Sequence, residues 1–237
     1  MNTQLKPDEP LAPRHPLPRS AQVDRDPFLL DLCRGKKVLH LACAAWPATQ
    51  MWCDDKSLLH LRMLDVCDRV AGFDWSKPGL EILEKHGVGD LHRLNLLEPD
   101  QVEGGWNKLG FEPDLVIAGE LLEHLDRAGL VLENCRRMMK PSCKMIITVP
   151  NAFSIRNLLH VLRGYEKVAP DHVSYYSYSN VRELAERNGY ALDRVNWYRY
   201  SPARKPIDRV VDTAIAPFIW MWPQLSEGLI AECSLAG

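Results

Sequence analysis

The sequence lacks the features that would place it in several specialised classes of protein. Its 237 residues carry 29 Lys and Arg against 31 Asp and Glu, so the net charge of −2 gives no surplus to attract nucleic acid. No uninterrupted apolar run reaches the roughly 20 residues that a membrane-spanning helix needs. The first residues are polar and rich in proline, unlike a signal peptide. We therefore expect a globular protein whose substrate is not a nucleic acid.

The cysteines also lack an informative spacing. No two are separated by the two residues typical of a zinc knuckle. An odd, scattered set, partly inside apolar runs, predicts reduced thiols and a cytoplasmic protein. The seven are Cys33, Cys43, Cys53, Cys67, Cys135, Cys143 and Cys233.

Glycine is missing where a nucleotide-binding fold needs it most. Residues 36–49, "KKVLHLACAAWPAT", read as a buried strand that runs into a turn without any glycine. Glycine permits positive φ and a close approach of the backbone to a ligand. Ala42 and Ala44 have the smallest side chain with a Cβ, and they permit that approach provided their φ stays negative. Trp46 and Pro47 add a bulky, stiff wall.

Strands and helices alternate along the rest of the chain. Residues 1–25 are interpreted as a flexible, proline-rich tail, and residues 26–237 as one domain. The alternation predicts an α/β fold with a mostly parallel sheet and helices on both faces. We expect strands at 37–43, 69–75, 90–96, 113–119, 144–150, 190–200 and 227–233, and helices at 26–33, 60–68, 76–87, 120–139 and 179–189.

Ligands of such sheets bind at the carboxyl ends of the strands. Asp74 ends the second expected strand, where a carboxylate can accept two hydrogen bonds from a ribose diol. The alternative is an acid that only stabilises the start of the next helix. Asn95 and Glu120 follow the third and fourth strands.

The order of motifs resembles the class I S-adenosylmethionine-dependent methyltransferases, in particular the ubiquinone-biosynthesis O-methyltransferase-like branch. The matching segments, "VLHLAC", "AGFDWS", "LNLLE", "DLVIAGELLEHL", "MMKPSCKMIITVPN" and "DHVSYYSYSNVRELAERNGYAL", cover about residues 36–200, and "LSEGLIAEC" resembles the final strand. The resemblance implies a Rossmann-like sheet of seven strands, the last antiparallel, and S-adenosylmethionine as cofactor. It places His40 at the family's acid and Ala42, Ala44 and Trp46 at its three glycines. The cofactor-binding residues expected are His40, Ala42, Cys43, Ala44, Asp74, Asn95 and Glu120.

A second group of polar residues follows the fourth strand. Glu120, Glu123 and His124 would share one helical face at i, i+3 and i+4, and His172 lies in a later loop. Such residues bind a divalent ion in ubiquinone-type relatives and would lower the pKa of the attacking oxygen. In the metal-free alternative, His124 or His172 acts as a catalytic base.

Two segments lie where this fold inserts substrate-binding helices, near 151–178 and 203–224. Residues 207–224, "IDRVVDTAIAPFIWMWPQ", are dominated by apolar side chains. They are interpreted as a helix packed on the domain, as a lid for an apolar substrate, or as a surface that associates weakly with a membrane.

The sequence thus predicts a methyltransferase that acts on a small molecule, at oxygen. Two alternatives remain open. One is a non-catalytic methyltransferase-like partner domain, which the glycine-free loop favours. The other is an N- or C-methyltransferase of the same fold, because fold alone does not decide chemistry. The oligomeric state is left open.

Overall fold

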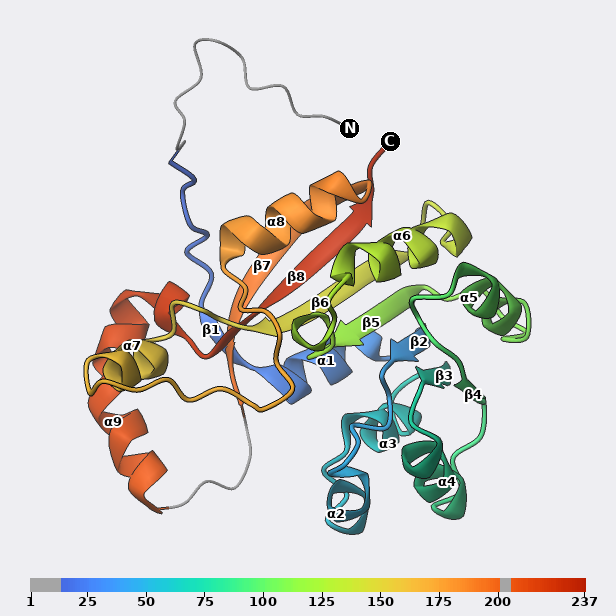
Figure 1. Ribbon diagram of the computed structural model, residues 1–237, viewed down its shortest axis with the longest axis horizontal. Coiled ribbons are helices and arrows are strands. Elements are labelled where there is room, and N and C mark those ends of the chain that lie inside the picture. The colour runs from blue at the N-terminus through green and yellow to red at the C-terminus, as the bar shows by residue number, and fades with distance from the viewer. Residues whose placement is uncertain (1–13, 201–205) are drawn as a thin grey trace.

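A single eight-stranded sheet organises the protein (Figure 1). The structure is a computed structural model that describes residues 14–200 and 206–237. The strand order is β1-β7-β8-β6-β5-β2-β3-β4, and β8 runs antiparallel to both of its neighbours while the other pairs are parallel. The Rossmann-like sheet with a reversed last strand is therefore confirmed. The strands are β1 Gln22–Asp24, β2 Lys37–Leu41, β3 Arg69–Asp74, β4 Leu91–Arg93, β5 Leu115–Gly119, β6 Lys144–Pro150, β7 Tyr190–Arg199 and β8 Gly228–Leu235.

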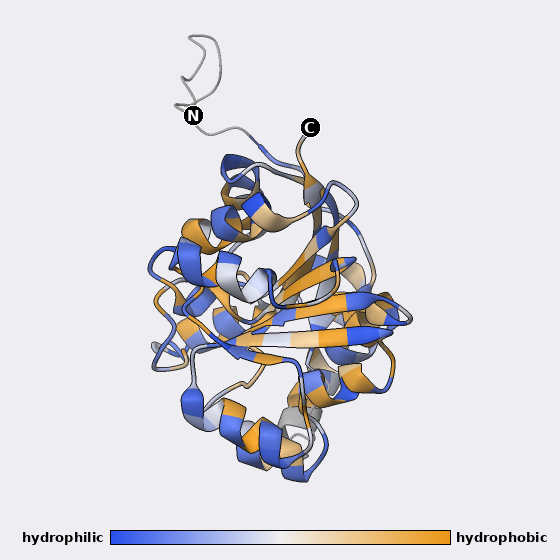
Figure 2. Ribbon diagram, turned by 90° about the vertical axis from the view of Figure 1, so that its right-hand side faces the viewer, coloured by the Kyte–Doolittle hydropathy of each residue, from blue (hydrophilic) through white to orange (hydrophobic). Residues whose placement is uncertain are grey.

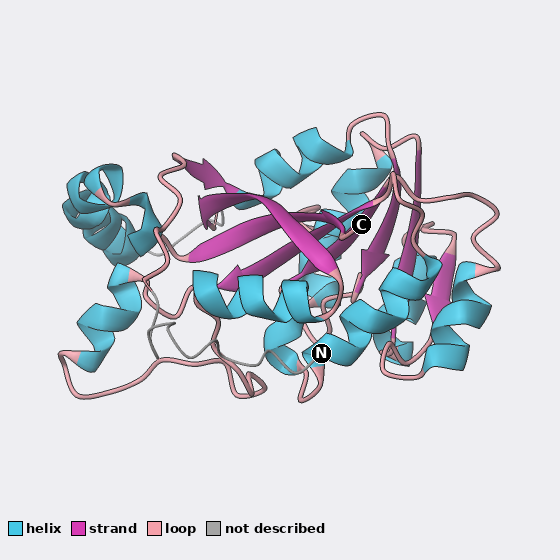
Figure 3. Cartoon of the chain, turned by 90° about the horizontal axis from the view of Figure 1, so that it is seen from above, coloured by secondary structure: helices cyan, strands magenta, loops and turns pink. Residues whose placement is uncertain are grey.

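Helices cover both faces of this sheet (Figure 3). One face packs against α5, α6 and α8, and the other against α1 and α3. A third apolar cluster joins α2 and α4 beside the turn after β2. The helices are α1 Arg25–Cys33, α2 Thr49–Asp54, α3 Leu59–Leu64, α4 Lys77–Lys85, α5 Pro99–Trp106, α6 Ala128–Met138, α7 Ile155–Val161, α8 Tyr178–Arg187 and α9 Pro206–Met221, with 3₁₀ turns η1 Leu122–His124 and η2 Pro223–Leu225.

Local sequence explains several of these elements. The hydroxyl of Ser76 accepts from the Gly79 N–H at 3.1 Å and caps α4, whose first turn contains Pro78. In β2, Leu39 and Leu41 join the core on one face, while Val38 joins the core on the other. Apolar residues accordingly line much of the strands in Figure 2. No described helix is both long and apolar enough to cross a bilayer.

The eighth strand corrects the interpretation of residues 1–25 as a tail. Residues 1–13 lie outside the described residues, but Gln22–Asp24 form β1, which pairs in parallel with β7 at the sheet edge. Gln22 Nε2 also donates to Ser226 Oγ at 2.9 Å, and Trp197 Nε1 donates to the Pro18 carbonyl at 2.8 Å. A strand of three residues has no periodicity to detect, so only its distant partners reveal it.

The predicted helix over 120–139 is also wrong in its first half. The chain forms η1, becomes extended at Leu125, and starts α6 only at Ala128. The carbonyls that would continue the helix are engaged elsewhere. The Tyr176 hydroxyl donates to the Leu122 carbonyl, and the N–H groups of Val173 and Ser174 donate to the Glu123 carbonyl. A loop 50 residues later in the chain thus replaces the helical hydrogen bonds.

Candidate functional site

The glycine-free turn after β2 adopts the conformation that glycine would favour. Ala42 has φ 53° and Ala45 has φ 51°, so the expectation that φ stays negative is wrong for Ala42. The left-handed conformation costs an L-residue roughly 1–2 kcal/mol. Such strain at the end of a central strand is typical of functional loops, where the surrounding structure holds the backbone in place.

The next two residues of the turn are small because of their protein neighbours. Cys43 and Ala44 are fully buried. A Cβ on Gly72 of β3 would lie 2.4 Å from Cys43 Sγ, and a Cβ on Gly79 of α4 would lie 2.8 Å from the Ala44 Cβ. The side chains of both residues therefore pack between β3 and α4, and only their backbone is available to line a cofactor site.

Asp74 fastens this turn to the next helix. Its Oδ2 accepts from the Ala44 N–H at 2.9 Å, and its Oδ1 accepts from the Ser76 N–H at 2.7 Å. Burial raises the pKa of Asp74, and these backbone donors oppose that shift. Each carboxylate oxygen has a second lone pair, so Asp74 keeps acceptor capacity. The next residue, Trp75, is exposed to solvent, and the Arg93 guanidinium lies over one face of its ring, 5.1 Å from the ring centroid.

His40 is not brought together with the side chains of the other predicted cofactor residues. It is a buried residue of β2, and its Nδ1 lies 3.2 Å from Nδ1 of His60 on α3. Burial, the His60 ring and the Arg25 charge all lower the pKa of His40. The two rings are therefore a neutral pair in the core, where one Nδ1 donates and the other accepts. The predicted contact of the His40 side chain with the cofactor stays a prediction that this placement does not favour.

Asn95 lies in the turn after β4. Its Oδ1 accepts from the Leu97 N–H at 3.0 Å, and its own N–H donates to Gln101 Oε1 at 2.9 Å. The side-chain oxygen thus shapes the turn, while the side-chain amide remains a donor that a ligand could use.

Glu120 belongs to a polar network that sequence reasoning missed. Its Oε1 accepts from the Tyr198 hydroxyl at 2.6 Å and from Thr148 Oγ1 at 2.8 Å, and its Oε2 accepts from the Tyr200 hydroxyl. Arg25 Nε donates to Thr148 Oγ1 at 3.2 Å and lies 3.7 Å from Glu120 Oε1. The network thus places a buried cation and a carboxylate at the ends of β5, β6 and β7. No local motif marks Arg25, which is the last residue of the predicted tail.

Three of the four predicted metal ligands come together. Glu123, His124 and His172 each place a ligand atom within 4.8 Å of the others. The two imidazole rings meet edge to face, with centroids 4.6 Å apart, and His124 Nδ1 lies 3.1 Å from Asp171 Oδ2. Glu120 is not part of this group, because its carboxylate is engaged by the network described above. The predicted helical face is replaced by η1 and the loop 171–174.

Glu123 is the unusual member of this group. Its side chain is 1% exposed, and neither carboxylate oxygen has a hydrogen-bond partner among the described residues. Burial, with a contribution from the Glu120 charge, raises the pKa of Glu123 to about 8. A buried carboxylate without donors is unfavourable unless a proton or a cation compensates it. Its neighbours are two imidazole rings, and a donor set of one carboxylate and two imidazole nitrogens fits a divalent ion.

A pocket of about 500 Å³ opens beside both groups. His172, which belongs to the group with Glu123 and His124, lines this pocket. Tyr200, which belongs to the Glu120 network, lines it as well. Arg156, His160 and Lys167 contribute further polar lining from α7 and the following loop. The pocket therefore adjoins the strand ends on the side that the predicted insertion near 151–178 covers.

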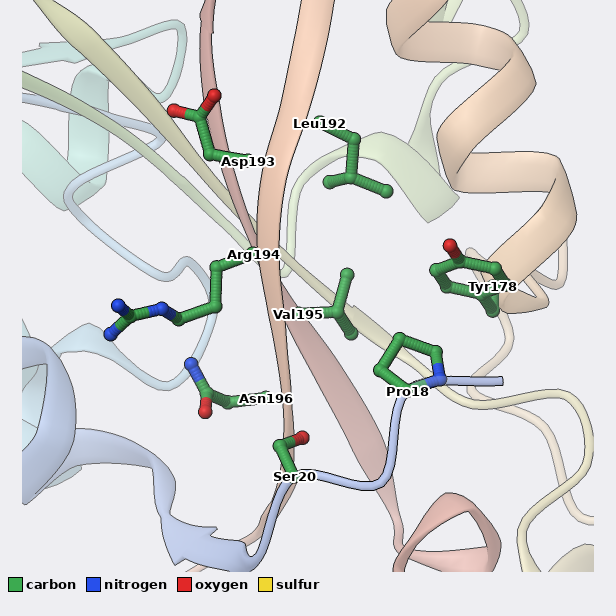
Figure 4. Close-up of a pocket in the computed structure, with 8 residues that line it drawn as sticks. All are labelled: Pro18, Ser20, Tyr178, Leu192, Asp193, Arg194, Val195 and Asn196. Carbon is green, nitrogen blue, oxygen red and sulfur yellow. The ribbon is translucent and has the colours of Figure 1, made fainter. Parts of the chain in front are cut away.

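A second pocket, of about 490 Å³, lies along the edge of the sheet (Figure 4). It is formed by Leu192–Asn196 of β7, Tyr178 and the chain at Pro18 and Ser20. The carboxylate of Asp193 within it already accepts hydrogen bonds from Lys144 Nζ at 3.3 Å and from Ser234 Oγ at 2.9 Å. None of the predicted site residues lines this pocket. It lies along the middle of β7 and not at the carboxyl ends of the strands.

The sheet and its strand-end turns form the fold of the class I S-adenosylmethionine-dependent methyltransferases. Residues 25–195 match the family described as "Methyltransferase domain", and the chain belongs to this family. The carboxyl-end turn after β2, the acid that ends β3 and the polar groups after β5 occupy the positions at which such sheets bind ligands.

Individual relatives are distant. "Ubiquinone biosynthesis O-methyltransferase" of Coxiella burnetii (strain RSA 493 / Nine Mile phase I) is 23% identical over 153 residues, which are 62% of this chain and 64% of that protein's length. The protein of the same name from Paraburkholderia xenovorans (strain LB400) is 24% identical over 193 residues, or 76% of this chain and 75% of that protein. The matches to the Coxiella proteins thus span less than two thirds of those relatives.

Solved structures show the same fold. A SAM-dependent methyltransferase from Archaeoglobus fulgidus is similar with a TM-score of 0.55 and 15% identity, over 89% of this chain and 91% of that one. Magnesium protoporphyrin IX methyltransferase from Synechocystis PCC 6803, solved with bound SAH, gives a TM-score of 0.54 and 13% identity, over 89% and 82%.

Proposed function

We propose that this enzyme methylates a hydroxyl group of a small molecule, with Glu123, His124 and His172 holding a divalent ion beside the acceptor. The observation that carries the proposal is the buried Glu123 carboxylate, which lacks donors and faces two imidazoles at the edge of a pocket. Distant similarity to O-methyltransferases supports oxygen as the acceptor atom.

The cofactor would lie across the strand ends. Asp74 retains acceptor capacity for the ribose hydroxyls, and the backbone of the turn at Ala42 lines the approach. The methionine part of S-adenosylmethionine carries both an ammonium and a carboxylate. Glu120 and Arg25 lie at the ends of β5 and β6, where they pair with each other, so a cofactor ammonium would have to compete with Arg25 for the Glu120 carboxylate.

The chain's own residues would then orient the acceptor. Asp171 Oδ2 lies 3.1 Å from Nδ1 of His124, so its carboxylate would hold the ring and leave Nε2 to bind an ion. Glu123, His124 and His172 would hold a divalent ion here, and the chemistry supplied would be a lower pKa of a bound hydroxyl. Carboxylate and imidazole ligands suit Mg²⁺, Mn²⁺ or Zn²⁺. The methyl transfer itself is an in-line displacement, so alignment of the oxygen with the sulfonium methyl is the main requirement.

A metal-free mechanism is the second candidate. Burial and the His124 charge lower the pKa of His172, which keeps the ring neutral and able to accept a proton from the acceptor hydroxyl. The same pocket would serve an N- or C-methyltransferase. A non-catalytic partner domain is supported by the strained, glycine-free turn alone.

Metal binding separates these possibilities without requiring the natural substrate. Isothermal titration of Mn²⁺ into the protein with S-adenosylhomocysteine should show one site in the wild type. It should show none in Glu123→Gln or His172→Ala. Glu112→Gln is the matched control, because Glu112 is an exposed carboxylate paired with Lys140. Methyl transfer to catechol, a simple vicinal diol, should stop with a chelator and return with Mn²⁺.

The contrary results are specific. Activity that persists with the chelator, together with no Mn²⁺ binding, would establish His172 as a free base. Absence of S-adenosylhomocysteine binding would instead leave the partner-domain interpretation.

A further inference from the structure

Two of the seven free cysteines meet on the face of the sheet that α1 and α3 cover. Cys33 is the last residue of α1 and is fully buried. Cys67 packs against the same apolar cluster from the turn between α3 and β3. A side-chain hydrogen bond joins the two thiols. Their sulfur atoms are therefore neighbours in the folded protein, although the cysteines are distant in the sequence.

Backbone hydrogen bonds hold together the two turns that carry these cysteines. The Gly35 N–H donates to the Val66 carbonyl at 2.8 Å, and the Asp68 N–H donates to the Lys36 carbonyl at 2.9 Å. A cysteine sulfur is attached directly to Cβ, so its position depends on the backbone and on one staggered torsion. The backbone that connects the two turns thus keeps the thiols close to each other.

Cys67 is the cysteine that an oxidant reaches most easily. It is half-buried, whereas the other six cysteines are buried. The hydrogen bond from the Cys33 thiol lowers the pKa of Cys67, while the pKa of each of the other six cysteines is raised. Thiolate character and exposure together decide which cysteine an oxidant attacks. Both properties select Cys67.

We propose that hydrogen peroxide oxidises this enzyme at Cys67 and that Cys33 converts the product into a disulfide. The Cys67 thiolate attacks one peroxide oxygen, the O–O bond breaks, and hydroxide leaves and takes up a proton to become water. The Cys33 sulfur loses its proton and attacks the sulfur of the resulting sulfenic acid, whose hydroxyl leaves as a second water. Two thiols are thereby oxidised to one disulfide, and one peroxide is reduced to water.

The disulfide would attach α1 to the rest of the domain at a second point. Near the start of α1, Asp26 pairs with Arg62 of α3 at 3.2 Å. A bond at Cys33 adds a covalent link at the last residue of the helix and closes a loop over residues 33–67, which includes β2 and the turn after it. Closing such a loop removes conformational freedom from the unfolded chain. Oxidation should therefore stabilise the fold.

Peptide mapping after oxidation tests the proposal. The reduced full chain is treated with a small molar excess of hydrogen peroxide, blocked with N-ethylmaleimide and cleaved with trypsin. The wild type should yield residues 26–34 joined to residues 63–69, with a mass about 2 Da below the sum of the two peptides, because two hydrogens are lost. Two of the seven thiols should disappear. The midpoint of urea unfolding should rise, and it should return to its original value with dithiothreitol.

Single variants separate the roles of the two cysteines. In Cys33→Ser the sulfenic acid has no resolving thiol, so dimedone should label Cys67 more strongly than in the wild type. Cys67→Ser should show no label, no joined peptide and no change in the urea midpoint on oxidation. Cys143→Ser is the matched control, because Cys143 and Cys135 form a second neighbouring pair in which both side chains are buried. It should form the same joined peptide as the wild type.

Three results would overturn the proposal. The first is a wild-type protein that keeps all of its thiols under these conditions. The second is a disulfide between two copies of the chain on a non-reducing gel, and the third is a peptide that joins any other two cysteines. In either of the last two cases Cys33 would not be the resolving thiol. The mapping is decisive in the wild type alone, whether or not a variant folds, and it does not depend on the identity of the methyl acceptor.

Discussion

The buried His40–His60 pair should make the protein sensitive to acid. His60 is 0% exposed, and burial lowers its pKa from 6.5 to about 4. Below pH 6.5 His60 therefore binds a proton in the unfolded chain but not in the folded protein. The free energy of unfolding consequently falls as the pH falls toward 4. From pH 7 to pH 4.5 the loss from His60 alone comes to about 2 kcal/mol by this linkage.

Replacing one ring isolates this contribution. In His60→Gln the amide can still hydrogen-bond to His40, but it does not titrate. The variant is expected to be less stable than the wild type at pH 7, because it packs less well. The difference in unfolding free energy should then shift by about 2 kcal/mol in favour of the variant at pH 4.5.

Urea unfolding followed by circular dichroism at several pH values measures this difference. His86→Gln is the matched control, because it removes a histidine that is exposed at the end of α4. Parallel pH profiles for the wild type and His60→Gln would refute the reasoning. His60 would then be able to take up a proton in the folded state.

Two further predictions concern the cofactor site. Asp74→Ala should weaken S-adenosylhomocysteine binding by roughly 1.5–3 kcal/mol in isothermal titration, the range for hydrogen bonds to a charged group; unchanged affinity would remove Asp74 from the ribose site. Ala42→Gly should keep binding and raise the unfolding free energy by about 1 kcal/mol, because it relieves the strain at φ 53°. Ala42→Val should abolish binding and destabilise the fold, and a tolerated valine would show that the cofactor does not approach this backbone.

Much of the sheet could be predicted because local patterns determine it. Alternating and continuous apolar runs located the strands that became β2, β3, β5, β6, β7 and β8, and Ser76 with Pro78 marked the start of α4. Asp74 could be placed at the carboxyl end of a strand for the same reason, since period and position along the chain are local properties.

The composition of the candidate site was less predictable. The spacing of Glu120, Glu123 and His124 suggested one helical face, yet the loop 171–174 takes the helical hydrogen bonds, so Glu120 joins a different network. Nothing local distinguishes Glu123 as a carboxylate without donors. That property depends on which side chains surround it after the chain has folded.

Tertiary structure alone decided the contacts between distant segments. The alternation of side chains along a strand predicts that His40 and Leu41 lie on opposite faces of the sheet. Only the packing of α3 shows that His40 contacts His60. Arg25 lies 123 residues from Thr148, and β1 finds its partner in β7. Such contacts form only when the fold has brought the segments together and excluded water, so no window of neighbouring residues records them.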